Sequence, residues 1–329
     1  MRTSTQQWLR DPKVQAATHL LRTEHEIPDW SVLYHPECYI SSTHMIDSKA
    51  LDNQILHGER SLMFGEATFI KQRIQESDKI NIIDLAETSG TSALPFIYEL
   101  LVDDSILGTY VPATPNAQVN NVAIRNLKNY LLQSRIFDPN NTEFKTASLT
   151  RNFNLEDSRD IIADISSEYR NERFCNLFLL LNSSLGNSEH PDQMLRNIYN
   201  SMTDNDYLVI IQGIYSRNSE AALIADYNSW ISKPEGWYVM RDIATIFTEE
   251  PTFNVKWNEQ KNGIQVYLNS TKPASLMGVD IDEGTEVTMF RSARFEDHQL
   301  KEMFEKTGLR ILNIAYDDTM NNAMYFLKK

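Results

Sequence analysis

The sequence predicts an α/β protein in which a mostly parallel sheet ends in an antiparallel C-terminal hairpin, accompanied by a second, smaller α+β lobe. Three observations favour this class. Short apolar runs alternate with longer amphipathic runs from about residue 79 to residue 215. Two further strand patterns, joined by a short turn, end the chain. The segments 1–60 and 216–295 break the alternation and are rich in aromatic residues.

The alternating region predicts five strands, each separated from the next by a helical pattern. This order gives a parallel sheet with right-handed crossovers. The strands are expected at residues 79–86, 108–113, 143–149, 175–184 and 206–215, and the intervening helices at 92–101, 117–134, 159–170 and 191–202. Pro95 suits a first helical turn, where a missing N–H costs little, and Asn116 stands where it can cap the second helix.

The end of the chain predicts one more helix and an antiparallel pair of strands. The helix is expected at residues 296–308, with Gly308 at its C-terminal cap position. Strands at 309–318 and 322–329 follow it. A mostly parallel sheet that ends in a hairpin resembles the Rossmann-like architecture of class I methyltransferases more than a dinucleotide-binding fold.

The interrupting segment 216–295 predicts a polar helix, a hairpin and a further strand. The elements are expected at residues 216–232, 252–259 with 263–270, and 285–295. We therefore expect a Rossmann-like domain formed by 61–215 plus 296–329. We expect 1–60 plus 216–295 to form a substrate-binding lobe over the carboxyl edge of the sheet.

Composition excludes several classes of function. A formal net charge of −14, without a basic run, argues against binding to nucleic acid. The two cysteines, Cys38 and Cys175, cannot form a disulfide framework, which indicates a reducing, cytoplasmic location. No stretch approaches eighteen apolar residues, so no membrane span is expected. The histidines lack metal-ligand spacing, so we expect no metal. No pattern indicates the oligomeric state.

Polar segments follow three of the predicted strands, where parallel sheets bind ligands. One of them lies within LLLNSSLGN (179–187), which resembles the F-L-G-S-T-I-G-N signature of the histidine-specific N-methyltransferase family. The best-known members of that family methylate histidine in ergothioneine biosynthesis. Five further segments resemble family motifs in the same order, and together they span nearly the whole chain: HPECYISS (35–42), SGTS (89–92), YVPAT (110–114), IADYNS (224–229) and FRSARF (290–295).

The resemblance implies S-adenosyl-L-methionine as cofactor, but the cofactor side departs from the family pattern. The family has glycines where this chain has Ala86 and Thr88, so only Gly90 remains in the loop. The family's ribose-binding acidic residue falls at Thr114, and its G-D-F falls at 147–149. A weaker cofactor site is expected unless Asp84, Glu87 or another carboxylate compensates. The implied cofactor residues are Asp84, Ala86, Glu87, Thr88, Ser89, Gly90, Thr114 and Ser148.

The resemblance also implies an acceptor pocket. Tyr39 and Tyr227 match the tyrosines that line the amine site, and Asn187 matches the asparagine that holds the amino and carboxylate groups. The glutamate that recognises imidazole is replaced by Phe290, whereas Ser292 is retained. Each has a simpler interpretation: aromatic packing for the tyrosines, helix capping for Asn187, an ordinary strand serine for Ser292. A solvated loop residue is likewise the simpler interpretation of Glu87.

Two functional hypotheses follow. The first is an S-adenosyl-L-methionine-dependent methyltransferase acting on the amine of a small amino-acid-like or aromatic acceptor other than histidine. Phe290 is then expected to line the acceptor pocket and to face Tyr39 or Tyr227. The alternative is a catalytically silent relative that binds a ligand or a protein partner, which the reduced glycine content of the cofactor loop favours.

Overall fold

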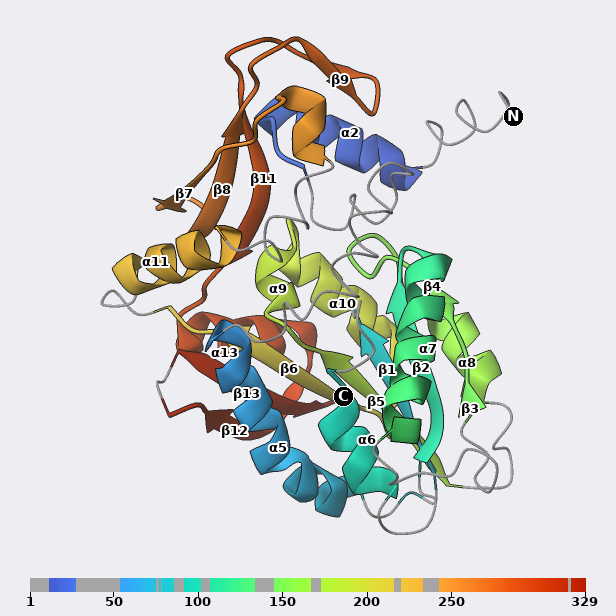
Figure 1. Cartoon of the computed structure of the whole chain (residues 1–329). Helices are drawn as coiled ribbons and strands as arrows, with labels where there is room; N and C mark the ends of the chain where they lie inside the picture. The colour runs from blue at the N-terminus through green and yellow to red at the C-terminus, as the bar shows by residue number, and fades with distance from the viewer. Residues whose placement is uncertain are drawn as a thin grey trace. The chain divides into compact units, whose positions relative to one another are not determined.

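The computed structural model describes residues 12–27, 54–74, 77, 79–85, 92–101, 107–133, 145–166, 173–215, 220–232, 243–318 and 321–329 (Figure 1). The chain divides into two compact units. The sheet unit comprises the described parts of Asp52–Gly186, His190–Ser216 and Arg294–Lys329. The small unit comprises the described parts of Met1–Leu51, Asn187–Glu189 and Arg217–Ala293.

A mostly parallel sheet forms the centre of the sheet unit. Its order is β12-β13-β6-β5-β1-β2-β3, with β4 also pairing with β2. Strands β1 to β6 pair in parallel, whereas β13 runs antiparallel to both β6 and β12. The strands are β1 (Lys79–Leu85), β2 (Leu107–Thr114), β3 (Lys145–Thr146), β4 (Leu149–Thr150), β5 (Phe174–Leu180), β6 (Tyr207–Gly213), β12 (Arg310–Tyr316) and β13 (Asn322–Lys328). The predicted parallel sheet with an antiparallel C-terminal hairpin is confirmed.

One predicted strand, 143–149, is wrong in its extent. Two short strands, β3 and β4, occupy this region and both pair with β2. Between them the N–H of Ala147 donates to the Tyr110 carbonyl, at 3.1 Å. The Asn120 side chain donates to the Leu149 carbonyl, at 3.0 Å. A side chain from a neighbouring helix thus takes part of the hydrogen bonding that a continuous strand would provide.

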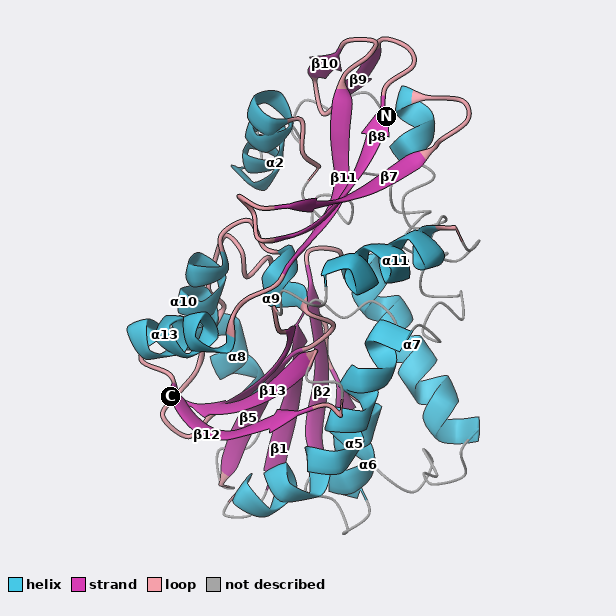
Figure 2. Ribbon diagram, turned by 90° about the vertical axis from the view of Figure 1, so that its left-hand side faces the viewer, coloured by secondary structure: helices cyan, strands magenta, loops and turns pink. Residues whose placement is uncertain are grey.

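Helices cover both faces of the sheet (Figures 1 and 2). Ile80 and Ile82 belong to one buried cluster, which includes residues of α5 (Gln54–Ile74), α6 (Leu94–Leu101) and α7 (Ala117–Gln133). Ile83 and Leu85 belong to another cluster with residues of α8 (Arg159–Ser166), α10 (Pro191–Ser201) and α13 (Asp297–Thr307). Successive strand residues point to opposite faces, so the apolar run of β1 builds both cores. The sequence patterns did not predict helix α5, which the structure shows.

The predicted helix termini are found in the structure. The Asn116 side chain accepts the backbone N–H groups of Gln118 and Val119, at 2.8 and 3.4 Å, and so caps α7. Pro95 is the second residue of α6. Gly308 ends α13 with φ 94°, in the left-handed region that glycine reaches without strain.

A chain of buried polar groups crosses the sheet near the amino ends of its strands. Asn81 on β1 donates to the Asn176 side chain on β5, at 3.0 Å. Asn176 in turn donates to Asp206, at 3.0 Å, and the Thr109 backbone N–H donates to Asn81, at 2.9 Å. Burial raises the pKa of the Asp206 carboxyl despite these hydrogen bonds. The chain of bonds therefore connects β2, β1 and β5 to the residue preceding β6.

The small unit contains an antiparallel sheet of order β11-β8-β7. Its elements are α2 (Pro12–Glu24), α11 (Glu220–Ile231), β7 (Phe253–Asn258), β8 (Gly263–Asn269), β9 (Ala274–Leu276), β10 (Val279–Ile281) and β11 (Glu286–Ala293). The hairpin expected at 252–270 is β7 and β8, whereas α2 and the β9–β10 pair are absent from the predicted elements. None of the helices that the structure describes is long and apolar enough to cross a membrane.

Candidate cofactor and acceptor sites

The order of the strands marks one edge of the sheet unit as a ligand site. The chain runs from β1 to β2 on one side of β1, while β5 lies on the other side. The position at which the strand order reverses in this way is a topological switch point. Open α/β sheets bind ligands there, outside the carboxyl ends of the strands. Ala86, Glu87, Thr88, Ser89 and Gly90 follow β1 directly and lie outside the described residues.

The turn after β5 reaches the same point. Asn182 and Ser183 adopt φ values of 58° and 53°, and the chain then enters the short helix α9 (Ser184–Asn187). Left-handed backbone at residues other than glycine is strained and concentrates at functional sites. The Asn182 side chain donates to the hydroxyl of Ser92, 3.3 Å away, just before α6. The turn after β5 thus contacts Ser92, the last residue of the SGTS segment (89–92) of the predicted cofactor loop.

Glu59 on α5 lies against this turn and is only 1% exposed. Its Oε1 accepts the Ser183 hydroxyl, at 2.9 Å, and Ser183 Oγ accepts the Gly213 N–H, at 3.1 Å. Among the described residues, Glu59 Oε2 is buried and has no hydrogen-bond partner. Burial raises the pKa of Glu59 to about 7, partly opposed by the Ser183 hydrogen bond, the positive charge of Arg294 and a hydrogen bond from the Asn182 backbone. Sequence reasoning missed this residue, because one glutamate in a polar helix gives no local signal.

The predicted cofactor residues on β1 and β2 are buried, and their side chains form hydrogen bonds with other residues of the chain. Asp84 is 0% exposed and its Oδ2 accepts the Tyr110 hydroxyl, at 2.9 Å. Thr114 is also 0% exposed, and its hydroxyl donates to the Asn116 carbonyl, at 3.1 Å. The Thr114 hydroxyl therefore does not reproduce the two hydrogen bonds with which a carboxylate holds a ribose.

The structure brings Thr114 together with the turn at 147–150. Thr114 pairs with Thr150 in the parallel register of β2 and β4, and the Arg151 N–H donates to the Thr114 carbonyl, at 3.1 Å. Ser148, the predicted adenosine-side residue, is exposed on this turn. The two segments expected to flank the adenosine are therefore neighbours at the carboxyl edge.

The predicted acceptor residues that are described lie in the small unit. Tyr227 on α11 is buried and its ring centroid lies 6.0 Å from that of Phe290 on β11, with a tilt of 33°. Ser292, two residues further along β11, is 1% exposed. Asn187 is half-buried at the end of α9, and the N-cap of α10 is His190 rather than Asn187. Tyr39 lies outside the described residues.

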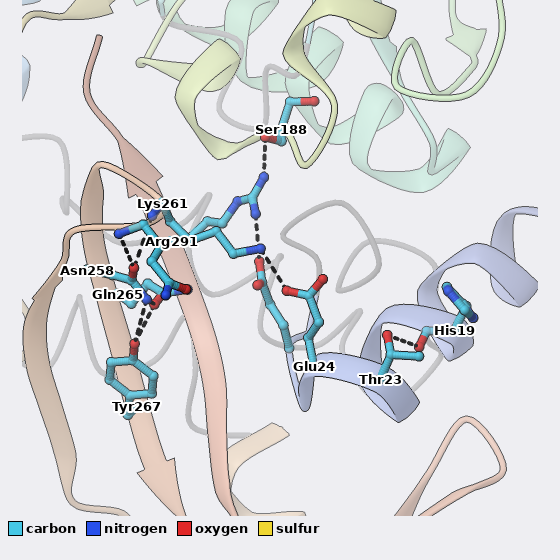
Figure 3. Close-up of polar contacts among 11 residues, drawn as sticks. His19, Thr23, Glu24, Ser188, Asn258, Lys261, Gln265, Tyr267 and Arg291 are labelled. Carbon is cyan, nitrogen blue, oxygen red and sulfur yellow. Dashed lines mark hydrogen bonds and ion pairs between the residues drawn. The ribbon is translucent and has the colours of Figure 1, made fainter.

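Arg291 joins three segments of the small unit (Figure 3). Its guanidinium forms an ion pair with Glu26, at 3.2 Å, and donates a short hydrogen bond to the Ser188 carbonyl. The side chains of Arg291 and Glu26 are 10% and 4% exposed. Burial raises the pKa of Glu26 although the positive charge of Arg291 opposes the shift. The guanidinium thus connects β11 to the 187–189 segment through the hydrogen bond and to the segment after α2 through the ion pair.

The backbone adds to this connection. Residues 25–27 pair with Thr288 of β11 through two hydrogen bonds of 2.9 and 2.8 Å. An exposed ion pair between Glu24 and Lys261, at 2.7 Å, lies beside the buried one (Figure 3). Within the part of the chain that the structure describes, no group of three or more His, Cys, Asp or Glu residues could hold a metal ion.

The sheet order, the antiparallel C-terminal pair and the polar switch point define the fold of a class I S-adenosyl-L-methionine-dependent methyltransferase. Residues 55–329 match the model of the family described as "Histidine-specific methyltransferase, SAM-dependent". The chain therefore belongs to this family of methyltransferases, and S-adenosyl-L-methionine is its cofactor. No curated protein sequence matches the chain.

Solved structures similar to this chain include two from other organisms. One is an S-adenosylmethionine-dependent methyltransferase from Clostridium acetobutylicum ATCC 824, with 8% sequence identity and a TM-score of 0.46 over 88% of this chain and 98% of that one. Another is the PH0226 protein from Pyrococcus horikoshii OT3, with 10% identity and a TM-score of 0.46 over 84% and 93% of the two chains.

A buried carboxylate among the described residues fits the charge of this cofactor. S-adenosyl-L-methionine carries an amino-acid end with an ammonium group, and the buried Glu59 Oε2 beside the turn after β5 lacks a partner among the described residues. An ammonium donates hydrogen bonds and complements a carboxylate.

Proposed function

We propose that this methyltransferase transfers a methyl group to the amine of a small acceptor with an apolar or aromatic side chain, and that histidine is a poor acceptor. The observation that carries the proposal is the contact between Phe290 and Tyr227, whose rings lie 6.0 Å apart. In the family motif, a glutamate stands where this chain has Phe290.

Phe290 changes what the proposed acceptor site can recognise. A phenyl ring offers no acceptor for an imidazole N–H. A histidine side chain buried against it would leave at least one N–H unpaired, at a cost of about 1–3 kcal/mol. That cost corresponds to a roughly tenfold to hundredfold loss of preference. Aromatic rings instead pack well against one another at centroid distances of about 4.5–7 Å.

The remaining residues have roles in orientation and in the exclusion of water. When bound, S-adenosyl-L-methionine supplies an electrophilic methyl group. Tyr227 places its aromatic ring beside Phe290, and an aromatic face suits an amine that gains positive charge. Asn187 offers both a donor and an acceptor for the amino-acid portion of an acceptor. Ser292 follows Phe290 on the same strand. Alignment of the amine with the methyl group, rather than covalent catalysis, is what such a site contributes.

The test is methyl incorporation from labelled S-adenosyl-L-methionine into a panel of amino acids and aromatic amines. The wild-type protein is expected to prefer acceptors with aromatic or apolar side chains over histidine by about tenfold or more. Phe290→Glu should raise transfer to histidine and lower transfer to the preferred acceptor, and Phe290→Leu serves as the apolar control. Efficient methylation of histidine by the wild-type protein would contradict the proposal. Cofactor binding without transfer to any amine would favour the silent alternative.

A further inference from the structure

The carboxylate of Glu59 is a buried acid beside the cofactor edge that none of the family motifs quoted above includes. It lies on α5, in the sheet unit, and contacts the left-handed turn that follows β5 through Ser183. One of its oxygens accepts that hydroxyl, while among the described residues the other oxygen has no hydrogen-bond partner. A buried acceptor without a partner costs about 1–3 kcal/mol or more when charged, so a fold that retains one needs a compensating ligand or role.

Several other groups surround this carboxylate. The Ser183 hydroxyl also accepts the Gly213 N–H and lies 3.5 Å from Nη1 of Arg294. Arg294 is 2% exposed, and a Cβ atom added at Gly213 would lie 1.1 Å from its Nη1. The charged groups that act on Glu59 are therefore Arg294, which favours the carboxylate, and Asp317, which disfavours it.

The same turn contacts the predicted cofactor loop on its other side. Asn182, adjacent to Ser183, donates to the hydroxyl of Ser92 at the end of the loop that follows β1. Glu59, Ser183, Asn182 and Ser92 thus form a continuous polar path from α5 through the turn after β5 to the start of α6. An open sheet binds its ligand at the carboxyl ends of its strands, the edge that this turn occupies.

We propose that Glu59 is the anionic residue that receives the ammonium group of the cofactor's amino-acid end. The missing partner of Oε2 is then a donor that arrives with the ligand. The inference rests on the placement of the cofactor at this edge, as in the function proposed above. An ammonium complements the carboxylate by charge and by its three donors. It also removes the penalty of a buried ionised oxygen without a partner.

The experiment is calorimetric titration of the full chain with two probes, S-adenosylhomocysteine and 5′-methylthioadenosine, which lacks the amino-acid end. Glu59→Gln keeps the shape of the side chain and removes its charge. This variant should bind S-adenosylhomocysteine about tenfold to hundredfold more weakly while its affinity for 5′-methylthioadenosine is unchanged. Glu66→Gln is the matched control, because Glu66 lies on the same helix and contacts Asn313 instead, at 3.1 Å.

The pH dependence of binding provides a second measurement that needs no variant. Below its pKa of about 7 the Glu59 carboxyl takes up a proton and cannot pair with an ammonium. Wild-type affinity for S-adenosylhomocysteine should therefore fall up to about tenfold per pH unit below neutrality, with no such fall for 5′-methylthioadenosine. This measurement tests the inference even if Glu59→Gln does not fold.

The outcomes separate this inference from the proposed function. Equal losses of affinity for both probes in Glu59→Gln, or no loss for either, would overturn the role of Glu59. The same pH dependence for the two probes would also overturn it. If the wild-type protein bound neither probe, cofactor binding itself would be contradicted, and the proposed function would fail together with the role of Glu59.

Discussion

At the scale of a single residue, burial of the Glu59 carboxyl makes the free energy of unfolding of the sheet unit depend on pH. Its pKa is raised from 4.5 to about 7 in the folded protein. Between these values the folded state binds a proton that the unfolded state has released, so stability falls as pH rises through this range. The loss from this group is about 3 kcal/mol and is complete above neutral pH.

Glu59→Gln should remove this contribution to the pH dependence of the free energy of unfolding. We expect the free energy of unfolding of the wild-type protein to fall, relative to that of the variant, by about 3 kcal/mol between about pH 5 and pH 8. Urea unfolding at several pH values measures the difference. Glu66→Gln should retain the wild-type slope. A Glu59→Gln variant with the same pH dependence as the wild type would show that this carboxyl does not titrate in the folded protein as its burial implies.

At the scale of elements, Arg291 connects β11 to the segment after α2 through its ion pair with Glu26, and to the 187–189 segment through its hydrogen bond to Ser188. Removing one partner of a buried pair leaves the other charge without compensation, at a cost of about 3–5 kcal/mol. Arg291→Met should therefore destabilise the small unit by this amount at about pH 8. The loss should be smaller at about pH 5, because the Glu26 carboxyl, with its raised pKa, can then take up a proton.

The exposed neighbouring pair provides the control for this prediction. Lys261 and Glu24 are 36% and 42% exposed, so Lys261→Met should cost less than about 1 kcal/mol. Chemical unfolding measures both variants, and hydrogen exchange at residues 187–189 reports whether the segment opens. Equal destabilisation by the two substitutions would mean that the burial of Arg291 and Glu26 has no energetic consequence.

At the scale of the whole molecule, the two compact units each have buried apolar interiors. In the sheet unit, Asn176 connects Asn81 to Asp206 across β1 and β5. Asn176→Ala would remove the acceptor of the buried Asn81 side-chain N–H, at a cost of about 1–3 kcal/mol, and one of the hydrogen bonds to Asp206, which keeps the Asn176 backbone N–H. Because chains with two compact units often unfold in more than one step, this variant and Arg291→Met should affect different transitions.

Hydrogen exchange resolved along the chain measures this difference. Asn176→Ala should speed exchange in β1, β5 and β6, whereas Arg291→Met should speed exchange in β8 and β11. Asn313→Ala is the control for the first variant. Asn313 is only partly buried, so its substitution should lower the free energy of unfolding by about 1 kcal/mol or less. Accelerated exchange throughout the chain in both variants would show that the protein unfolds as one cooperative unit.

The elements that sequence reasoning identified are those with strong local patterns. The apolar runs of β1, β5 and β6, the Asn116 cap and the Gly308 terminus follow from hydrophobic periodicity and backbone preference. Helix α5 has a weak amphipathic pattern, and β9 and β10 are three residues long, so neither gives a comparable signal. The hydrogen bond from Asn120 on α7 to the Leu149 carbonyl, at the start of β4, joins residues 29 positions apart, so no local pattern predicts it.

For the candidate sites, the sequence alone determined the order of strands and helices and the segments that follow β1, β2 and β5, and the family resemblance predicted a glutamate where Phe290 stands. These features depend on neighbouring residues and on residue type. Only the tertiary structure placed Glu59 against Ser183, 124 residues away, Asn81 against Asn176 and Glu26 against Arg291. The physical reason is that a side-chain contact between distant segments is set by strand register and helix packing, which no local pattern specifies.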